Sequence, residues 1–155
     1  MNQPAPPDPR AAADLAELGR QIGIPDLCLD NTGCCQLTFD SRWLVILLHA
    51  TANRFWTITC FLAASGTAIS ADAQHAMLRA NFMGAGCAGG SLSIAPDGRA
   101  CLQYRLAGGE TSGGILLAAI ENLLDQAEIW SERIQRSEAP PTGPNPTHHW
   151  IQGRV

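Results

Sequence analysis

Residues 111–136 constrain the fold more than any other part of this chain. Their apolar side chains recur every three or four positions, so they share one side of an α-helix. This stripe consists of Leu116, Ile120, Leu123, Ala127, Trp130 and Ile134. We expect the hydroxyl of Thr111 to cap the start of the helix. At about 39 Å such a helix can cross a small domain, so the preceding residues must supply the surface on which it packs.

The bulk composition is sufficient for one domain of this kind. The chain has 155 residues, 46% of them hydrophobic, and a chain of this size can bury its own core. Ten basic and fourteen acidic residues give a net charge of −4, and no basic cluster is present to bind a nucleic acid. The N-terminus lacks a secretory signal pattern, and the apolar run at residues 43–48 is too short to span a membrane. These features predict a soluble cytoplasmic protein without membrane insertion.

Further helices and strands are predicted before residue 111. Asp8 and Pro9 suit the start of a helix, Leu15 and Leu18 lie on its apolar face, and Gly23 suits its end. Ser70 is expected to cap a middle helix over residues 71–83. Alternating patterns predict strands at residues 27–30, 35–39, 43–49, 55–63, 91–95 and 100–106.

The order of these elements predicts an α+β fold. Three helices are expected to pack on a twisted antiparallel sheet in the order α-βββ-α-ββ-α, with the run at residues 27–30 as a further strand of the first group. We expect residues 1–9 to be disordered and residues 10–136 to form the domain. Residues 137–155 are rich in proline, which cannot continue a helix, and are expected to form a flexible tail.

Two sequence features can indicate a cofactor or a metal, but neither has the context or spacing that such a site requires. Residues 84–89 read G-x-G-x-x-G, but a predicted helix precedes them and a predicted strand follows, the reverse of the dinucleotide-binding order. The six cysteines lack the paired spacing of a zinc site, so we expect free thiols that act as small buried hydrophobes. They are Cys28, Cys34, Cys35, Cys60, Cys87 and Cys101. The sequence therefore predicts no cofactor and no metal.

Catalytic signatures are equally weak. His49 and His75 are the histidines inside the predicted domain, and neither lies in a signature such as G-x-S-x-G. His148 and His149 belong to the proline-rich tail, which would not hold a catalytic pair rigidly. The sequence favours a protein that is not an enzyme, with a small enzyme that uses His49 or His75 as an alternative.

The strands carry more apolar surface than two or three helices readily cover. Trp43, Phe55, Trp56 and Phe61 lie on strands that have apolar residues on both faces. This excess predicts an oligomer interface, a peptide-binding surface, or both. Complete coverage by the helices is the other interpretation.

Three stretches carry a resemblance to a known family. The first, residues 18–40, combines the end of a helix, an Asn-x-Gly turn and a strand that reads Leu-x-Phe-Asp. The second reads Leu-Arg-Ala-Asn at residues 78–81, and the third covers residues 120–130 of the long helix. In this order and spacing, over about residues 12–136, they resemble the class I type III secretion chaperones of the CesT (Tir chaperone) type. The glycine-rich loop and the proline-rich tail depart from that pattern.

The resemblance implies a bacterial cytoplasmic homodimer without catalytic activity. Such a protein binds the N-terminal segment of a secreted effector in extended form, keeps it soluble and supports its delivery to the secretion apparatus, whose ATPase is a further expected partner. An adaptor of similar fold that binds a folded regulator is an alternative. The expected effector contacts are Leu15, Leu18, Leu37, Phe39, Val45 and Leu47. The expected dimer contacts are Ala76, Met77 and Ala80.

Overall fold

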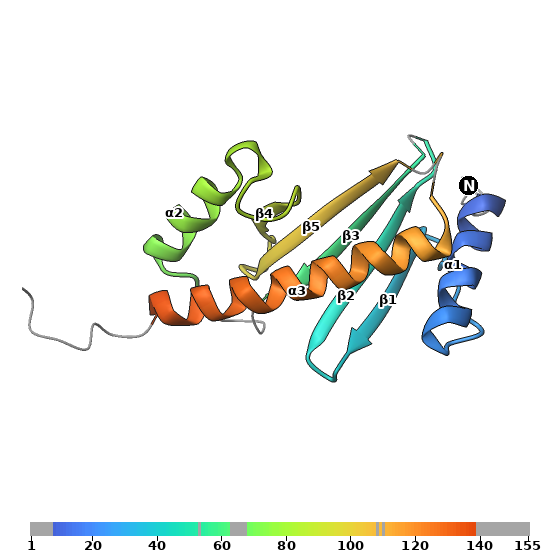
Figure 1. The fold of residues 1–155 in the computed structure, drawn as a ribbon, viewed down its shortest axis with the longest axis horizontal. Coiled ribbons are helices and arrows are strands. Elements are labelled where there is room, and N and C mark those ends of the chain that lie inside the picture. Colours follow the sequence, from blue (N-terminus) through green and yellow to red (C-terminus); the bar gives the residue numbers. More distant parts are fainter. Residues whose placement is uncertain (1–7, 53, 63–67, 108, 110, 139–155) are drawn as a thin grey trace, which may run out of the picture.

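Five strands form one antiparallel sheet in the protein, whose structure is a computed structural model that describes residues 8–52, 54–62, 68–107, 109 and 111–138. The strands are β1 (Cys34–Phe39), β2 (Trp43–Ala50), β3 (Phe55–Phe61), β4 (Ser91–Ile94) and β5 (Ala100–Ala107). Their order across the sheet is β1-β2-β3-β5-β4, so β1 and β4 are its two edges (Figure 1).

Three α-helices accompany the sheet, as the sequence predicted. They are α1 (Pro9–Ile22), α2 (Ala71–Ala80) and α3 (Gly113–Glu138), with a short 3-10 turn, η1 (Phe82–Gly84), after α2. The long helix α3 runs along the sheet, α1 lies near one end of it, and α2 lies near the other end beside β4 (Figure 1). This arrangement confirms the α+β fold.

The apolar stripe of α3 lies in the core as predicted. Each of its six residues is at most 2% exposed, and the indole Nε1 of Trp130 donates a hydrogen bond to the carbonyl oxygen of Gly86 at 3.0 Å. The predicted cap was wrong by one residue. The helix begins at Gly113, so the hydroxyl of Ser112 accepts a bond from the N–H of Ile115 at 3.3 Å. The hydroxyl of Thr111 instead donates to the carbonyl oxygen of Ala107 at 2.6 Å.

The start of α1 is confirmed, but the strand predicted at residues 27–30 is absent. Asp8 caps α1, Pro9 occupies its first turn, and Gly23 ends it with a φ of 77°. Asp30 forms a side-chain turn, because its Oδ1 accepts bonds from the N–H of Thr32 at 2.8 Å and of Cys34 at 2.9 Å. The hydroxyl of Thr32 also donates to this oxygen, and these bonds lower the pKa of Asp30. The first strand group therefore has three strands.

The middle helix ends three residues earlier than predicted. α2 stops at Ala80, and Met83 adopts a φ of 54°, a left-handed conformation that no helix can continue through. The glycine-rich loop at residues 84–90 therefore has a helix before it and β4 after it. This is the reverse of the strand–loop–helix order of a dinucleotide-binding site. The N-terminal segment predicted to be disordered (residues 1–9) and the predicted flexible tail (residues 137–155) lie mostly outside the described residues. His148 and His149 lie in the part of the tail that is not described. Of the described residues in these two segments, Asp8 and Pro9 begin α1 and Ser137 and Glu138 end α3.

The cysteines are free thiols, and they differ in burial. Burial raises the pKa of Cys35 to about 11 and that of Cys60 to about 12, whereas Cys28 is exposed. Since only the thiolate reacts with an alkylating agent, we expect Cys28 to be modified in native protein at pH 8 well before Cys35 and Cys60. Peptide mass spectrometry after brief iodoacetamide treatment measures this order. Equal modification of Cys28 and Cys60 without denaturant would contradict the burial described here.

Candidate functional site

The two faces of the sheet have different surroundings. On one face the side chains of β2, β3 and β5 join residues of all three helices in a single core cluster. The strand residues buried in this cluster include Leu37, Val45, Leu47, Trp56, Ile58, Cys60 and Leu102. The alternate residues point to the other face, where Ile46 and Phe61 are half-buried and Leu48 is 41% exposed. We call this second surface the open face.

Most of the predicted effector contacts lie in the core between the helices and the face of the sheet that they cover, the covered face. Leu15, Leu18, Val45 and Leu47 are fully buried and Leu37 is 6% exposed, so the structure does not place these five at a surface. The remaining predicted contact, Phe39, is half-buried against the same core. A partner could reach the buried five only if α1 or α3 moved away from the sheet. Their contact with an effector stays a prediction.

The open face forms a shallow groove of about 360 Å³ that is lined by residues of all five strands and of the turn between β4 and β5. Its apolar side chains include Ile46, Leu48 and Phe61, and its polar ones are short or neutral. The side-chain amide of Gln103 donates a hydrogen bond to the hydroxyl of Thr59 at 3.2 Å, so the polar groups of the groove partly satisfy one another. No charged residue lines the groove, so an apolar segment could lie in it without burying an unpaired charge.

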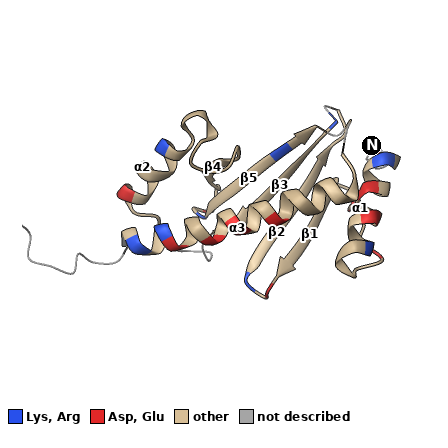
Figure 2. Ribbon diagram, in the orientation of Figure 1, with Lys and Arg blue, Asp and Glu red and all other residues tan. Residues whose placement is uncertain are grey.

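The charge pattern separates the open face from the helices. The five strands contain no acidic residue and one arginine, Arg105, whereas acidic residues lie on all three helices (Figure 2). The guanidinium of Arg105 lies 4.0 Å from the ring centre of Phe55, and that of Arg99 lies 3.7 Å from the ring centre of Phe61. Arg99 also pairs with Asp97 at 2.7 Å. The open face is thus apolar, with arginines stacked on two of its aromatic rings.

β1 offers a strand edge beside this face. The N–H of His49 donates to the carbonyl oxygen of Gly33 at 2.9 Å, so these two residues form a hydrogen-bonded pair between the strands. In an antiparallel pair of strands every second residue is bonded in this way, so Gln36 and Thr38 point their backbone N–H and C=O groups away from β2. An extended chain could pair with these groups.

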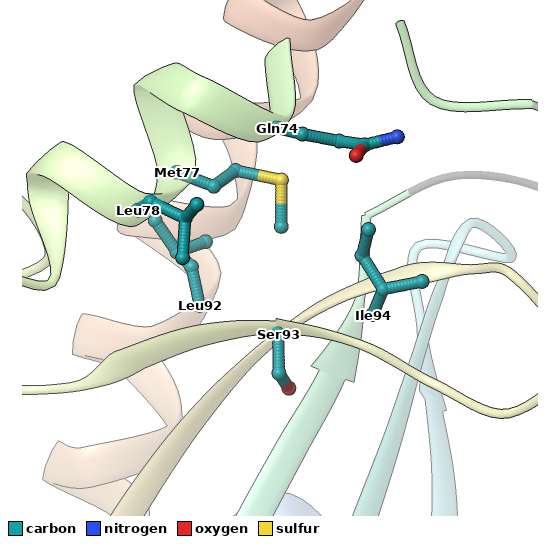
Figure 3. Close-up of a pocket in the computed structure, with 6 residues that line it drawn as sticks. All are labelled: Gln74, Met77, Leu78, Leu92, Ser93 and Ile94. Carbon is teal, nitrogen blue, oxygen red and sulfur yellow. The ribbon is translucent and has the colours of Figure 1, made fainter. Parts of the chain in front are cut away.

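A second apolar hollow lies between α2 and β4. It has a volume of about 240 Å³ and is lined by Gln74, Met77, Leu78, Leu92, Ser93 and Ile94. Figure 3 shows the side chains of Met77, Leu78 and Ile94 around this hollow, with that of Ser93 directed away from it. Leu78, which lines this hollow, is strongly exposed, and so are Phe82 and Met83 in the turn that follows α2. We call these exposed residues and the hollow the α2 surface.

The predicted dimer contacts lie at or behind the α2 surface. Met77 lines the hollow but is only 3% exposed, Ala80 is 9% exposed, and Ala76 is half-buried. These three are largely covered by the chain itself, and the exposed apolar residues beside them are Leu78 and Phe82. The dimer contact of the three residues stays a prediction.

The structure does not bring the two candidate catalytic histidines together. His49 is 6% exposed, and its ring packs on that of Trp56 with centres 4.9 Å apart, whereas His75 is exposed on α2. In the part of the chain that the structure describes, no group of three or more His, Cys, Asp or Glu residues is placed to hold a metal ion. None of the described helices is both long and apolar enough to cross a membrane.

Several solved structures share this fold. The complex of ExsC with ExsE matches with a TM-score of 0.70 and 22% identity, over 77% of this chain and 90% of that chain. The HopA1–SchA chaperone–effector complex matches with a TM-score of 0.65 and 18% identity, over 82% and 99%. The Yersinia pestis type III secretion chaperone SycH, in complex with a fragment of YscM2, matches with a TM-score of 0.62 and 19% identity, over 77% and 98%. A search of curated protein sequences gave no significant match.

The family assignment rests on sequence and agrees with the predicted resemblance. The profile of the Tir chaperone protein (CesT) family matches residues 14–131, which include most of α1, the whole sheet and most of α3. These are also the elements that bury the common core and form the open face. On this match, the chain belongs to the Tir chaperone protein (CesT) family.

Proposed function

We propose that this protein is a cytoplasmic chaperone, without enzymatic activity, that binds the N-terminal segment of a type III secreted effector and keeps it soluble. Membership of the Tir chaperone protein (CesT) family supports this proposal. Two similar solved structures are described as a chaperone–effector complex and as a type III secretion chaperone with a bound fragment. The observation that carries the proposal is the open face, an apolar sheet surface that none of the helices described in the structure covers.

The open face and the edge of β1 would act together in binding. The backbone groups of Gln36 and Thr38 would pair with an extended effector segment, whatever its sequence. Ile46, Leu48 and Phe61 would contact apolar side chains of the effector and so select among segments. Delivery to the ATPase of the secretion apparatus stays a prediction.

Co-purification from a secreting bacterium tests this function. The tagged full-length protein should recover a secreted protein, and truncation should locate the binding within about the first 100 residues of that partner, enough to cover an interface of ordinary size. Recovery through a folded domain instead would favour the adaptor alternative. Recovery of housekeeping proteins alone would contradict the chaperone function.

We further propose that the protein is a homodimer that buries the α2 surface. Phe82 is 76% exposed in the turn that follows α2, the helix that lines the apolar hollow, and a surface that carries both an exposed ring and a hollow can be complementary to itself across a two-fold axis. Phe82→Asp should therefore convert the dimer to a monomer at micromolar concentration in sedimentation velocity. Ile129→Asp places the same charge on the exposed side of α3 and should leave the dimer intact. A wild-type monomer, or a Phe82→Asp dimer, would contradict this interface.

A further inference from the structure

The side chain of Asn81 covers part of the free edge of β4. Its Nδ2 donates a hydrogen bond to the carbonyl oxygen of Leu92 at 2.9 Å, and its Oδ1 accepts one from the N–H of Leu92 at 2.7 Å. The N–H of Ala95 donates to the carbonyl oxygen of Arg99 at 2.8 Å, so Ser93 and Ser91 form the hydrogen-bonded pairs with β5, and the backbone groups of Leu92 between them point away from the sheet. The side-chain amide of Asn81 thus presents a donor and an acceptor to Leu92, as the backbone N–H and C=O groups of a neighbouring strand would.

The chain holds Asn81 in this position from both sides. Asn81 ends α2, and its own N–H donates to the carbonyl oxygen of Met77 at 3.2 Å. The glycine-rich loop returns to the same corner, where the N–H of Gly86 donates to the carbonyl oxygen of Ala80 at 3.1 Å. A Cβ on Gly86 would lie 2.6 Å from that of Ala80, so only glycine permits this close approach. The corner between α2 and the loop thus occupies the place of a sixth strand.

The opposite edge of the sheet is covered only at its beginning. The carboxylate of Asp30 accepts the N–H of Cys34 at 2.9 Å, and the N–H of Asp30 donates to the carbonyl oxygen of Cys34 at 2.8 Å. Two residues further along β1, Gln36 and Thr38 point their backbone groups outward. In the described part of the chain no side chain is hydrogen-bonded to these groups, in contrast to Leu92 at the other edge.

We propose that Asn81 closes the β4 edge, so that the sheet accepts an added strand at β1 alone. An uncovered edge strand pairs with any extended chain, including another copy of the same protein, and a covering loop prevents this. The kind of partner that the open edge fits is an extended polypeptide segment, and naming that segment as an effector rests on the proposed function. The closure itself rests on the contacts of Asn81.

Amide hydrogen exchange of the full-length protein, followed by NMR, tests the closure. The N–H groups of Leu92 and Ile94 point to the same edge, but only that of Leu92 is bonded to Asn81, so Leu92 should exchange more slowly. Asn81→Ala should accelerate exchange at Leu92 about tenfold, the effect of one lost hydrogen bond. Asn81→Asp keeps the acceptor and should preserve the protection of Leu92. Asn81→Ser, whose hydroxyl does not reach Leu92, replaces Asn81→Ala if that variant does not fold.

Sedimentation velocity tests the consequence for strand pairing. Because Ile94 also lines the hollow of the α2 surface, the variants are compared in the Phe82→Asp background, in which that interface carries a charge. Asn81→Ala should form species larger than those of the Phe82→Asp parent at equal concentration. Adding Ile94→Pro, which removes a further outward donor from the β4 edge, should suppress them. Unchanged exchange at Leu92, or a size distribution like that of the parent, would overturn the proposal. Neither experiment on Asn81 requires an effector. A negative result here would therefore not contradict effector binding, and a failure to capture an effector would not contradict the closure of the β4 edge.

Discussion

Trp130→Ala should lower the free energy of unfolding by about 3–5 kcal/mol, the range found for large aromatic residues removed from a core. The indole is 1% exposed in the C-terminal half of the α3 stripe, and its Nε1 donates to the carbonyl oxygen of Gly86. The variant therefore loses core volume and the bond between α3 and the glycine-rich loop. Urea denaturation followed by circular dichroism measures the change.

Two control variants separate these contributions. Trp130→Phe keeps most of the apolar volume and loses the hydrogen bond, so its effect should be much smaller than that of the alanine variant. Ile129→Ala changes the adjacent, half-exposed residue of α3 and should cost less than about 1 kcal/mol. If Trp130→Ala were no more destabilising than Ile129→Ala, α3 would not be packed on the sheet by this stripe.

Leu48→Asp should weaken effector binding about a hundredfold or more while the chain stays folded. Leu48 is 41% exposed and lines the groove of the open face, so an aspartate is hydrated in the free protein. Binding of an apolar segment would remove that water, and the desolvation of an unpaired carboxylate costs several kcal/mol. Isothermal titration of the captured effector segment measures the loss, and thermal unfolding of the free variant verifies the fold.

Ile129→Asp is the matched control for this experiment. Ile129 is 44% exposed, close to the value for Leu48, and its substitution introduces the same charge on the opposite side of the molecule. We expect the control to bind the effector segment like the wild type. Equal loss of binding in both variants would point to net charge as the cause, and normal binding by Leu48→Asp would exclude the open face as the site.

The elements whose apolar residues repeat on one side could be predicted from sequence. The three- and four-residue spacing places the six residues of the α3 stripe on one side of the helix, and all six are buried. Likewise, Asp8, Pro9 and Gly23 have conformational preferences that mark the two ends of α1 without reference to the rest of the chain. In each case local geometry alone decides the outcome.

The position of the partner surface could not be predicted in this way. β2 reads Trp-Leu-Val-Ile-Leu-Leu-His-Ala and has apolar residues on both faces, so its sequence does not show which face the helices cover. The predicted contacts Val45 and Leu47 lie on the covered face, and their neighbours Ile46 and Leu48 lie on the open one. For the same reason Leu37→Asp, a natural choice from sequence, would place a charge in the core and unfold the chain.

Side-chain bonds to the backbone account for the remaining differences. The run at residues 27–30 alternates like a strand, but the carboxylate of Asp30 binds the N–H of Cys34 and turns the chain. Asn81 looks from sequence like an ordinary polar helix residue, yet it forms two bonds with Leu92, eleven residues away. The first bond is local and the second joins two elements, and the periodicity of apolar residues reveals neither.

If an extended effector segment lies on the open face and pairs with β1, NMR of the protein alone and with the captured N-terminal segment will detect it. Amide exchange at Gln36 and Thr38 should become slower, and the methyl signals of Ile46 and Leu48 should shift. Changes confined to the exposed side of α3, with these four residues unaffected, would contradict this binding mode.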